Sequence, residues 1–148
     1  MGVGTFTIAR QMETWSHAQA IWDLLGRERP APPMRLRNIA ELGVRTFGWA
    51  YRNRGLPVPA VRPHIRLAAP DGGTWEWNDP DTEDRVSGDA LAFCQVVTQT
   101  RNVADTALAV DGATAQHWMT IAQCFAGLPE DPPKPGTRRR SRAYPGRQ

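Results

Sequence analysis

Apolar side chains recur with the period of an α-helix through the first third of the chain. Residues 5–25 carry them at this spacing without a proline, which predicts a mostly buried amphipathic helix that ends at Gly26. Its apolar residues are Phe6, Ile8, Met12, Trp15, Ile21, Trp22, Leu24 and Leu25. The prolines within residues 27–33 exclude a helix there. The helical period returns in residues 34–54, so we expect a second helix that ends at Gly55.

After residue 56 the period changes to that of a β-strand. Residues 61–68 alternate apolar and polar side chains, which predicts a half-buried strand. The pair Asp71-Gly72 favours a tight hairpin turn, and residues 74–77 then form the return strand. Residues 85–86 predict a further short strand.

The rest of the chain alternates helical and strand patterns. Ser87 suits the N-cap of a helix over residues 87–101, residues 106–110 predict a short strand, and residues 113–125 predict the last helix. The order of hairpin, helix, strand and helix predicts an α+β fold. Its small sheet, mixed or antiparallel, should be covered by helices.

Two glycines inside the second predicted helix indicate close packing. Gly43 and Gly48 weaken an isolated helix, but they allow another helix to approach closely.

Cys94 and Cys124 lie among apolar residues, which indicates buried free thiols in a reducing compartment. Their spacing fits neither a zinc pair nor a redox motif, and a catalytic thiol is the less favoured alternative.

The positive charge of the chain is concentrated at its C-terminal end. The net charge is +3, but residues 128–148 hold six Lys and Arg side chains against two carboxylates, so residues 1–127 are close to neutral. The prolines and glycines of residues 128–148 predict a disordered tail. Its arginine run, residues 138–142, suits nonspecific contact with nucleic acid, although a solvated tail is the simpler interpretation. No specific nucleic-acid partner is expected.

Hydrophobic runs in this chain are short. None approaches the roughly 20 residues that span a bilayer, and the N-terminus lacks the basic and long apolar regions of a signal peptide. The sequence therefore predicts a cytoplasmic protein with no membrane partner.

Glu13 and His17 are the residues with the clearest chemical potential. They lie four residues apart in the first predicted helix, so their side chains project from one face. A carboxylate and an imidazole placed in this way can share a divalent metal ion, while a solvated pair is the ordinary interpretation of this spacing. A zinc-type site needs at least three protein ligands. His64 and His117 have no potential ligand at suitable spacing, so we expect both to be surface histidines.

Several sequence blocks resemble one bacterial family. The blocks are Met12 to Gln19 (Met-Glu-Thr-Trp-Ser-His-Ala-Gln), residues 39–46, residues 67–77, residues 93–99 and residues 121–127. In this order they are similar to the metal-binding proteins of the DinB / mycothiol-dependent maleylpyruvate isomerase superfamily. The branch concerned is often labelled "wyosine base formation domain-containing". The resemblance covers nearly all of the chain before the tail.

The resemblance implies a four-helix bundle that binds a divalent metal ion through three side chains. One ligand is a His on an early helix, and the others are a Glu and a His four apart on a late helix. Glu13 and His17 match the late pair, whereas the early helices would precede Met1. The resemblance thus implies three regions: a partial DinB-like bundle of two helices (1–55), a small sterol-carrier-like α+β domain (56–127) and the disordered tail (128–148).

Two classes of function follow from this resemblance. The first is a metal- and thiol-dependent isomerase or S-transferase that uses mycothiol or a similar small thiol, with zinc held by Glu13 and His17. Without the early His the chain is expected to be incomplete as a catalyst, and no catalytic residue is assigned. The second is a non-catalytic module that binds a small molecule or forms a homodimer. A role in wyosine modification of tRNA is a weaker third alternative.

Overall fold

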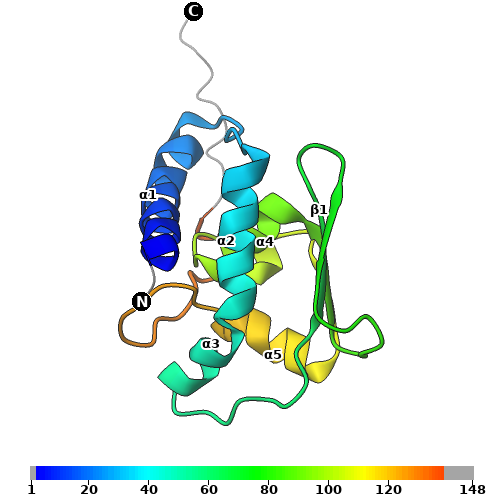
Figure 1. Ribbon diagram of the computed structural model, residues 1–148. Coiled ribbons are helices and arrows are strands. Elements are labelled where there is room, and N and C mark those ends of the chain that lie inside the picture. Colours follow the sequence, from blue (N-terminus) through cyan, green and yellow to red (C-terminus); the bar gives the residue numbers. More distant parts are fainter. Residues whose placement is uncertain (1–2, 139–148) are drawn as a thin grey trace, which may run out of the picture.

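The computed structural model describes residues 3–138 of the 148-residue chain. Within that range the structure has five α-helices and a four-stranded sheet, which confirms the predicted α+β class (Figure 1). The helices are α1 (Val3–Leu25), α2 (Pro33–Arg45), α3 (Phe47–Asn53), α4 (Ala90–Val97) and α5 (Ala113–Ile121). The strands are β1 (His64–Ala68), β2 (Thr74–Trp77), β3 (Arg85–Asp89) and β4 (Ala109–Asp111). None of the helices in this range is long and apolar enough to cross a membrane.

The sheet is mixed, with the strand order β2-β1-β3-β4. β1 pairs antiparallel with β2, so that Leu67 lies opposite Trp75 and the predicted hairpin is confirmed. On its other side β1 pairs parallel with β3, where Leu67 lies opposite Gly88. β4 then pairs antiparallel with β3. Of the two kinds of sheet that the sequence allowed, the mixed one is present.

The helices are layered beside the sheet. In Figure 1, α1 lies at the outer edge of the molecule, α2 stands between α1 and α4, and α4 and α5 lie next to the strands. Buried side chains from these layers form one hydrophobic core. At its centre the Trp118 ring packs edge-on against Phe47 and Phe93, with centroids 5.2 and 6.0 Å apart. The core runs across the domain boundary expected at residue 55, and that boundary stays a prediction.

α2 and α4 cross at a glycine. A Cβ atom on Gly43 would lie 2.8 Å from Val97 Cγ2, so only glycine allows the two helices to come this close. The close approach predicted at Gly43 is therefore confirmed. At Gly48 the three atoms nearest to an added Cβ all belong to Arg52 of the same helix, so there the close approach stays a prediction.

The helix predicted over residues 34–54 is interrupted at Thr46. Thr46 Oγ1 donates to the carbonyl oxygens of Leu42 and Gly43, at 2.8 and 3.1 Å. Such side-chain bonds to the preceding turn compete with the backbone pattern and bend a helix. α2 therefore ends at Arg45, and α3 begins at Phe47.

The helix cap predicted at Ser87 is also wrong. β3 continues to Asp89, because its backbone stays paired with β1 as far as Ala68. Asp89 caps α4 in place of Ser87, and its carboxylate accepts a hydrogen bond from the backbone N–H of Ala92 at 3.0 Å. The later elements are shorter than predicted, since β4 covers Ala109–Asp111 and α5 ends at Ile121.

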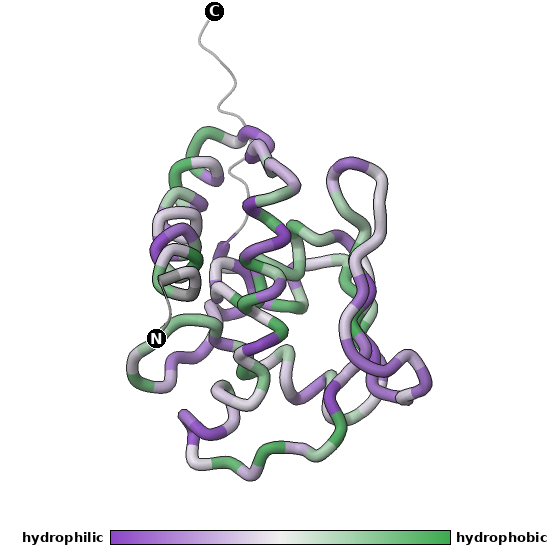
Figure 2. Tube along the Cα trace, viewed as in Figure 1, coloured by the Kyte–Doolittle hydropathy of each residue, from purple (hydrophilic) through white to green (hydrophobic). Residues whose placement is uncertain are grey.

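α1 confirms the first predicted helix but not its predicted burial. Met12 and Trp15 are buried, and the guanidinium of Arg29 lies over the Trp15 ring at 4.0 Å from its centroid. Four other apolar side chains are exposed, and these are Phe6, Ile21, Leu24 and Leu25. Figure 2 shows hydrophobic stretches near both ends of α1 and a hydrophilic stretch between them. The helix therefore places apolar side chains on its outer face as well as in the core.

Residues 128–137 are bound to the body of the fold, so the predicted disorder is wrong for this part of the tail. Gln123 Nε2 donates to the carbonyl oxygen of Leu128 at 3.1 Å, and Asn102 Nδ2 donates to that of Pro133 at 3.0 Å. The backbone N–H of Gly136 donates to the Asp105 carboxylate. Composition predicted disorder because it does not show these distant partners. Residues 139–148, which hold most of the arginine run, lie outside the described range.

Candidate functional site

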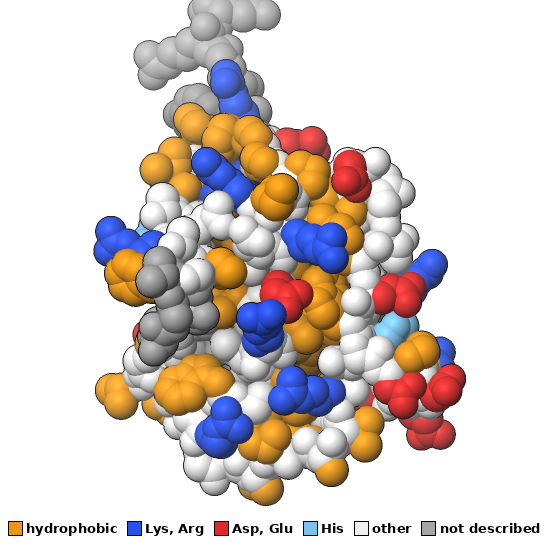
Figure 3. Space-filling view, viewed as in Figure 1, with side chains coloured by type: hydrophobic (Ala, Val, Ile, Leu, Met, Phe, Trp, Pro, Cys, Tyr) orange, Lys and Arg blue, Asp and Glu red, His pale blue; other side chains and the backbone are white. Residues whose placement is uncertain are grey.

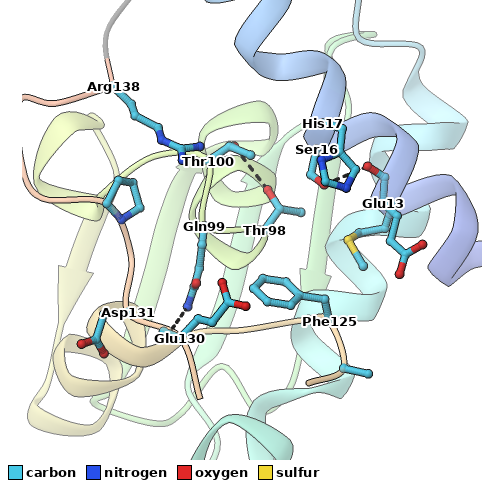
Figure 4. A pocket seen from close by; sticks show the side chains of 13 residues that line it. Glu13, Ser16, His17, Thr98, Gln99, Thr100, Phe125, Glu130, Asp131 and Arg138 are labelled. Atoms are coloured by element: carbon cyan, nitrogen blue, oxygen red, sulfur yellow. Dashed lines mark hydrogen bonds between the residues drawn. The ribbon is translucent and has the colours of Figure 1, made fainter. Parts of the chain in front are cut away.

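A cavity of about 420 Å³ opens between α1 and the C-terminal part of the chain (Figure 4). Its walls are one side of α1, the turn of residues 98–100 that follows α4, and parts of residues 125–138. From α1 it is lined by Met12, Glu13, Ser16 and His17. This volume lies within the roughly 300–1,000 Å³ of small-molecule sites.

The predicted ligands Glu13 and His17 border this cavity. Figure 4 shows them one turn apart on α1, and both side chains are exposed. Ser16 lies between them, and its hydroxyl donates to the carbonyl oxygen of Glu13 at 2.9 Å. The structure thus places the pair at a cavity and leaves both side chains accessible to a ligand.

The wall opposite α1 includes the polar turn Thr98-Gln99-Thr100, whose side chains are all buried. Gln99 has a left-handed φ of 55°, and its amide donates to the carbonyl oxygens of Ala122 and Glu130 at 3.1 and 2.7 Å. This turn therefore fixes the C-terminal segment at the cavity. Sequence reasoning missed it, and the available signal was a run of three polar residues at the end of an apolar helical pattern.

Among the described residues that line the cavity, the charge is net negative. Glu13, Glu130 and Asp131 provide three carboxylates, against the single guanidinium of Arg138. Asp131 forms an ion pair with Arg54, whose Nη1 lies 2.8 Å from Oδ1. In Figure 4 the Glu130 carboxylate points toward Phe125 and the side of the cavity formed by α1. Two carboxylates on opposite walls favour a cationic ligand.

Glu13 and His17 supply two of the donors that a zinc-type site needs. An imidazole nitrogen and a carboxylate oxygen are both ordinary zinc ligands. Across residues 3–138, no three side chains of His, Cys, Asp or Glu lie close enough together to hold a metal ion. Within this range the pair therefore does not by itself complete a three-ligand site.

The other two histidines differ in their exposure to solvent. His117 is exposed on α5 as predicted, and its ring packs edge-on against Tyr51 with centroids 5.4 Å apart. His64 is buried, so its predicted surface position is wrong. Its Nε2 lies 3.6 Å from Glu76 Oε2, and its backbone N–H donates to the carbonyl oxygen of Asp84 at 2.8 Å. Neither residue lines the cavity of Glu13 and His17.

Both cysteine thiols should resist a thiol reagent in the folded protein. Cys94 and Cys124 are buried free thiols, as predicted. Burial raises the pKa of Cys124 to about 12 and that of Cys94 well above its ordinary value. Because the thiolate is the reactive form, we expect no reaction with a disulfide reagent at mildly alkaline pH and complete reaction in concentrated guanidinium chloride. Rapid modification of either thiol in native buffer would contradict this prediction.

Relatives of this chain include two uncharacterized proteins of Mycobacterium tuberculosis: Rv0036c of strain ATCC 25618 / H37Rv and MT0041 of strain CDC 1551 / Oshkosh. Each is 44% identical to the chain over 129 residues, which cover 87% of the chain and 50% of the relative. The chain thus spans about half the length of these relatives. No protein-family model and no solved structure matches it. The names of the relatives assign no activity.

Proposed function

We propose that this chain binds a divalent metal ion, with zinc the preferred metal, through Glu13 and His17. The observation that carries the proposal is the position of this pair at the edge of a cavity of about 420 Å³ with net negative charge. The imidazole and the carboxylate supply the donors, and Glu130 on the opposite wall adds negative charge that favours a cation.

The activity that best suits such a site is that of a metal- and thiol-dependent isomerase or S-transferase. A divalent metal lowers the pKa of a thiol that it binds and so favours the nucleophilic thiolate. Glu13 and His17 would hold the metal, and the remaining cavity would bind mycothiol or a similar small thiol together with the substrate. This part of the proposal rests on the resemblance of residues 12–19 and the later blocks to mycothiol-dependent isomerases.

A second candidate function is that of a non-catalytic module which acts by self-association. The exposed apolar residues on the outer face of α1 favour it, because large exposed apolar patches mark interaction surfaces. The two candidates are compatible, since a site with two ligands can be completed by another molecule.

Zinc binding to the purified chain tests the first candidate. We expect saturable heat release on titration of the chelator-treated protein with zinc, and a loss of affinity of at least about tenfold in both His17→Gln and Glu13→Gln, because outer-shell and ligand changes commonly cost that much or more. Metal content by inductively coupled plasma mass spectrometry gives the stoichiometry.

Matched substitutions away from the cavity serve as controls. His117→Gln removes another exposed histidine, and Glu83→Gln removes another exposed carboxylate. Neither should change zinc affinity. Equal loss in His117→Gln and His17→Gln would mean nonspecific binding by surface histidines, and unchanged binding in both Glu13→Gln and His17→Gln would overturn the proposal.

A further inference from the structure

The outer face of α1 forms a continuous exposed stripe. Between residues 6 and 25 the exposed positions follow the spacing of one helix face. They are Phe6, Thr7, Arg10, Glu13, Thr14, His17, Ala20, Ile21, Leu24 and Leu25. Leu24 is 78% exposed, and Phe6, at the other end, is 58% exposed. Figure 3 shows hydrophobic side chains gathered on the surface around the C-terminal end of α1 and the loop after it.

The composition of this stripe is unusual for a helix face in water. Arg10 and Glu13 are its only Lys, Arg, Asp or Glu residues, while half of its members are apolar. A helix face that meets only solvent is normally rich in charged side chains. Depletion of charge together with apolar and aromatic residues is instead typical of the central part of a protein interface.

The stripe is complementary to itself when two copies run antiparallel. The positions Phe6, Arg10, Glu13, His17, Ala20 and Leu24 alternate spacings of four and three, as the seam of a coiled coil does. If a two-fold axis passes beside the helix midway between Glu13 and His17, Phe6 lies opposite Leu24 and Arg10 lies opposite Ala20. Glu13 then lies opposite His17 of the second copy.

The charged residues of the stripe favour an antiparallel pair of α1 helices over a parallel pair. In a parallel pair Arg10 would lie opposite Arg10 and Glu13 opposite Glu13, and both contacts repel. In the antiparallel pair each carboxylate meets an imidazole, which can donate a hydrogen bond to it, and the apolar ends of the two helices cover each other. The seam from residue 6 to residue 24 is about 27 Å long. A seam formed by one helix from each copy is short, so we expect a weak dimer with a dissociation constant on the order of 1 to 100 µM.

We propose that a second copy of this chain covers the outer face of α1 in an antiparallel homodimer, and that Glu13 and His17 of both copies meet at the two-fold axis. The dimer itself does not depend on the proposed function. The further step, in which two carboxylates and two imidazoles together hold one zinc ion, rests on the proposed function and supplies the ligands that one chain lacks.

The oligomeric state over a range of concentration tests the dimer. Sedimentation velocity across roughly 1 to 200 µM protein, with a chelator and with zinc, should show a monomer–dimer equilibrium that zinc shifts toward dimer. Leu24→Glu should raise the dimer dissociation constant at least about tenfold, because it places a charge in the apolar end of the seam. Leu128→Glu is the matched control, since Leu128 is equally exposed (83%) but lies outside α1, and it should leave the equilibrium unchanged.

Disulfide cross-linking tests the direction of the two helices. Residues 6 and 24 are opposite each other only in the antiparallel pair, so a mixture of Phe6→Cys and Leu24→Cys proteins should form a mixed disulfide dimer on mild oxidation. Each variant alone should not, because its two new thiols would lie about 27 Å apart along the seam. The native thiols, Cys94 and Cys124, are buried and should not interfere.

The outcomes separate this inference from the proposed function. A monomer at all concentrations, with and without zinc, would overturn the dimer and would mean that another partner covers the face. Cross-linking of Phe6→Cys alone, or a dimer unaffected by Leu24→Glu, would overturn the antiparallel arrangement. A dimer that takes up no zinc would support the interface and contradict the metal proposal. Zinc bound by a chain that stays monomeric at all concentrations would support the metal proposal and contradict the interface.

Discussion

Replacing Asp23 with Asn is expected to lower the free energy of unfolding by about 3 kcal/mol, because it leaves a buried guanidinium without its counter-charge. The Arg101 side chain is almost fully buried and binds the Asp23 carboxylate through both terminal nitrogens. The distance from Nη1 to Oδ2 is 2.7 Å, and the same nitrogen also donates to the carbonyl oxygen of Thr100 at 2.9 Å. A neutral amide can replace only part of these charge-assisted bonds.

Urea unfolding followed by tryptophan fluorescence measures this loss. Asp131→Asn is the matched control, since it neutralises the carboxylate of the Asp131–Arg54 ion pair, in which the aspartate is highly exposed. Exposed pairs contribute about 0–1 kcal/mol, so this variant should unfold close to the parent protein. If the two variants lost the same stability, the buried Asp23–Arg101 pair would contribute no more than an exposed ion pair.

Replacing Gly112 with Ala is expected to cost about 3 kcal/mol, because a methyl group has no room there and the backbone conformation suits only glycine. Gly112 precedes α5 with φ 85° and ψ 150°. A Cβ atom would collide with Asp84 Oδ1 and would lie 2.8 Å from Asp84 Cα. The same Oδ1 accepts a hydrogen bond from the backbone N–H of Ala115 at 3.0 Å, so moving Asp84 also removes the cap of α5.

Gly72→Ala separates backbone strain from collision. Gly72 has φ 87°, close to that of Gly112, but no atom lies within 4 Å of the position of an added Cβ. We expect Gly72→Ala to cost about 1 kcal/mol, which is the ordinary penalty for a left-handed residue with a side chain. Thermal and urea unfolding of both variants should therefore rank Gly112→Ala well below Gly72→Ala. A reversed order would mean that Asp84 does not cap α5.

The parts of this fold that local patterns encode could be predicted from the sequence. The hairpin around Asp71-Gly72 and the helical spacing from residue 5 to 25 depend on neighbouring residues, and the structure has both. The broken helix at Thr46 was missed because a single hydroxyl bonded to the preceding turn changes the backbone without changing the hydrophobic period. The cap predicted at Ser87 is wrong because the pairing of β3 with β1, which keeps Ser87 in a strand, joins segments about 20 residues apart and leaves no local signal.

The candidate site was predicted only in part, because contacts between segments far apart in the sequence leave no local pattern. The spacing of Glu13 and His17 places them on one face of a helix, but no local pattern shows that residues 98–100 and 130–138 lie across from them. The burial of His64 was also missed, since alternation along a strand does not reveal which segments cover each side. The outer face of α1 was expected to be buried because apolar residues usually are, and the structure instead leaves it at the surface.

The C-terminal wall of the cavity is held almost wholly through its main chain. Gln99, Asn102 and Gln123 donate to the carbonyl oxygens of Glu130, Pro133 and Leu128, and Gln123 also accepts from the N–H of Glu130. Main-chain atoms are present whatever side chain a residue carries. Substitutions in this wall can therefore change the side chains that face the cavity without changing the course of the backbone. This holds as long as the side chains of Gln99, Asn102 and Gln123 are kept. Natural sequence variation can therefore change the side chains that line the cavity with little loss of folding stability.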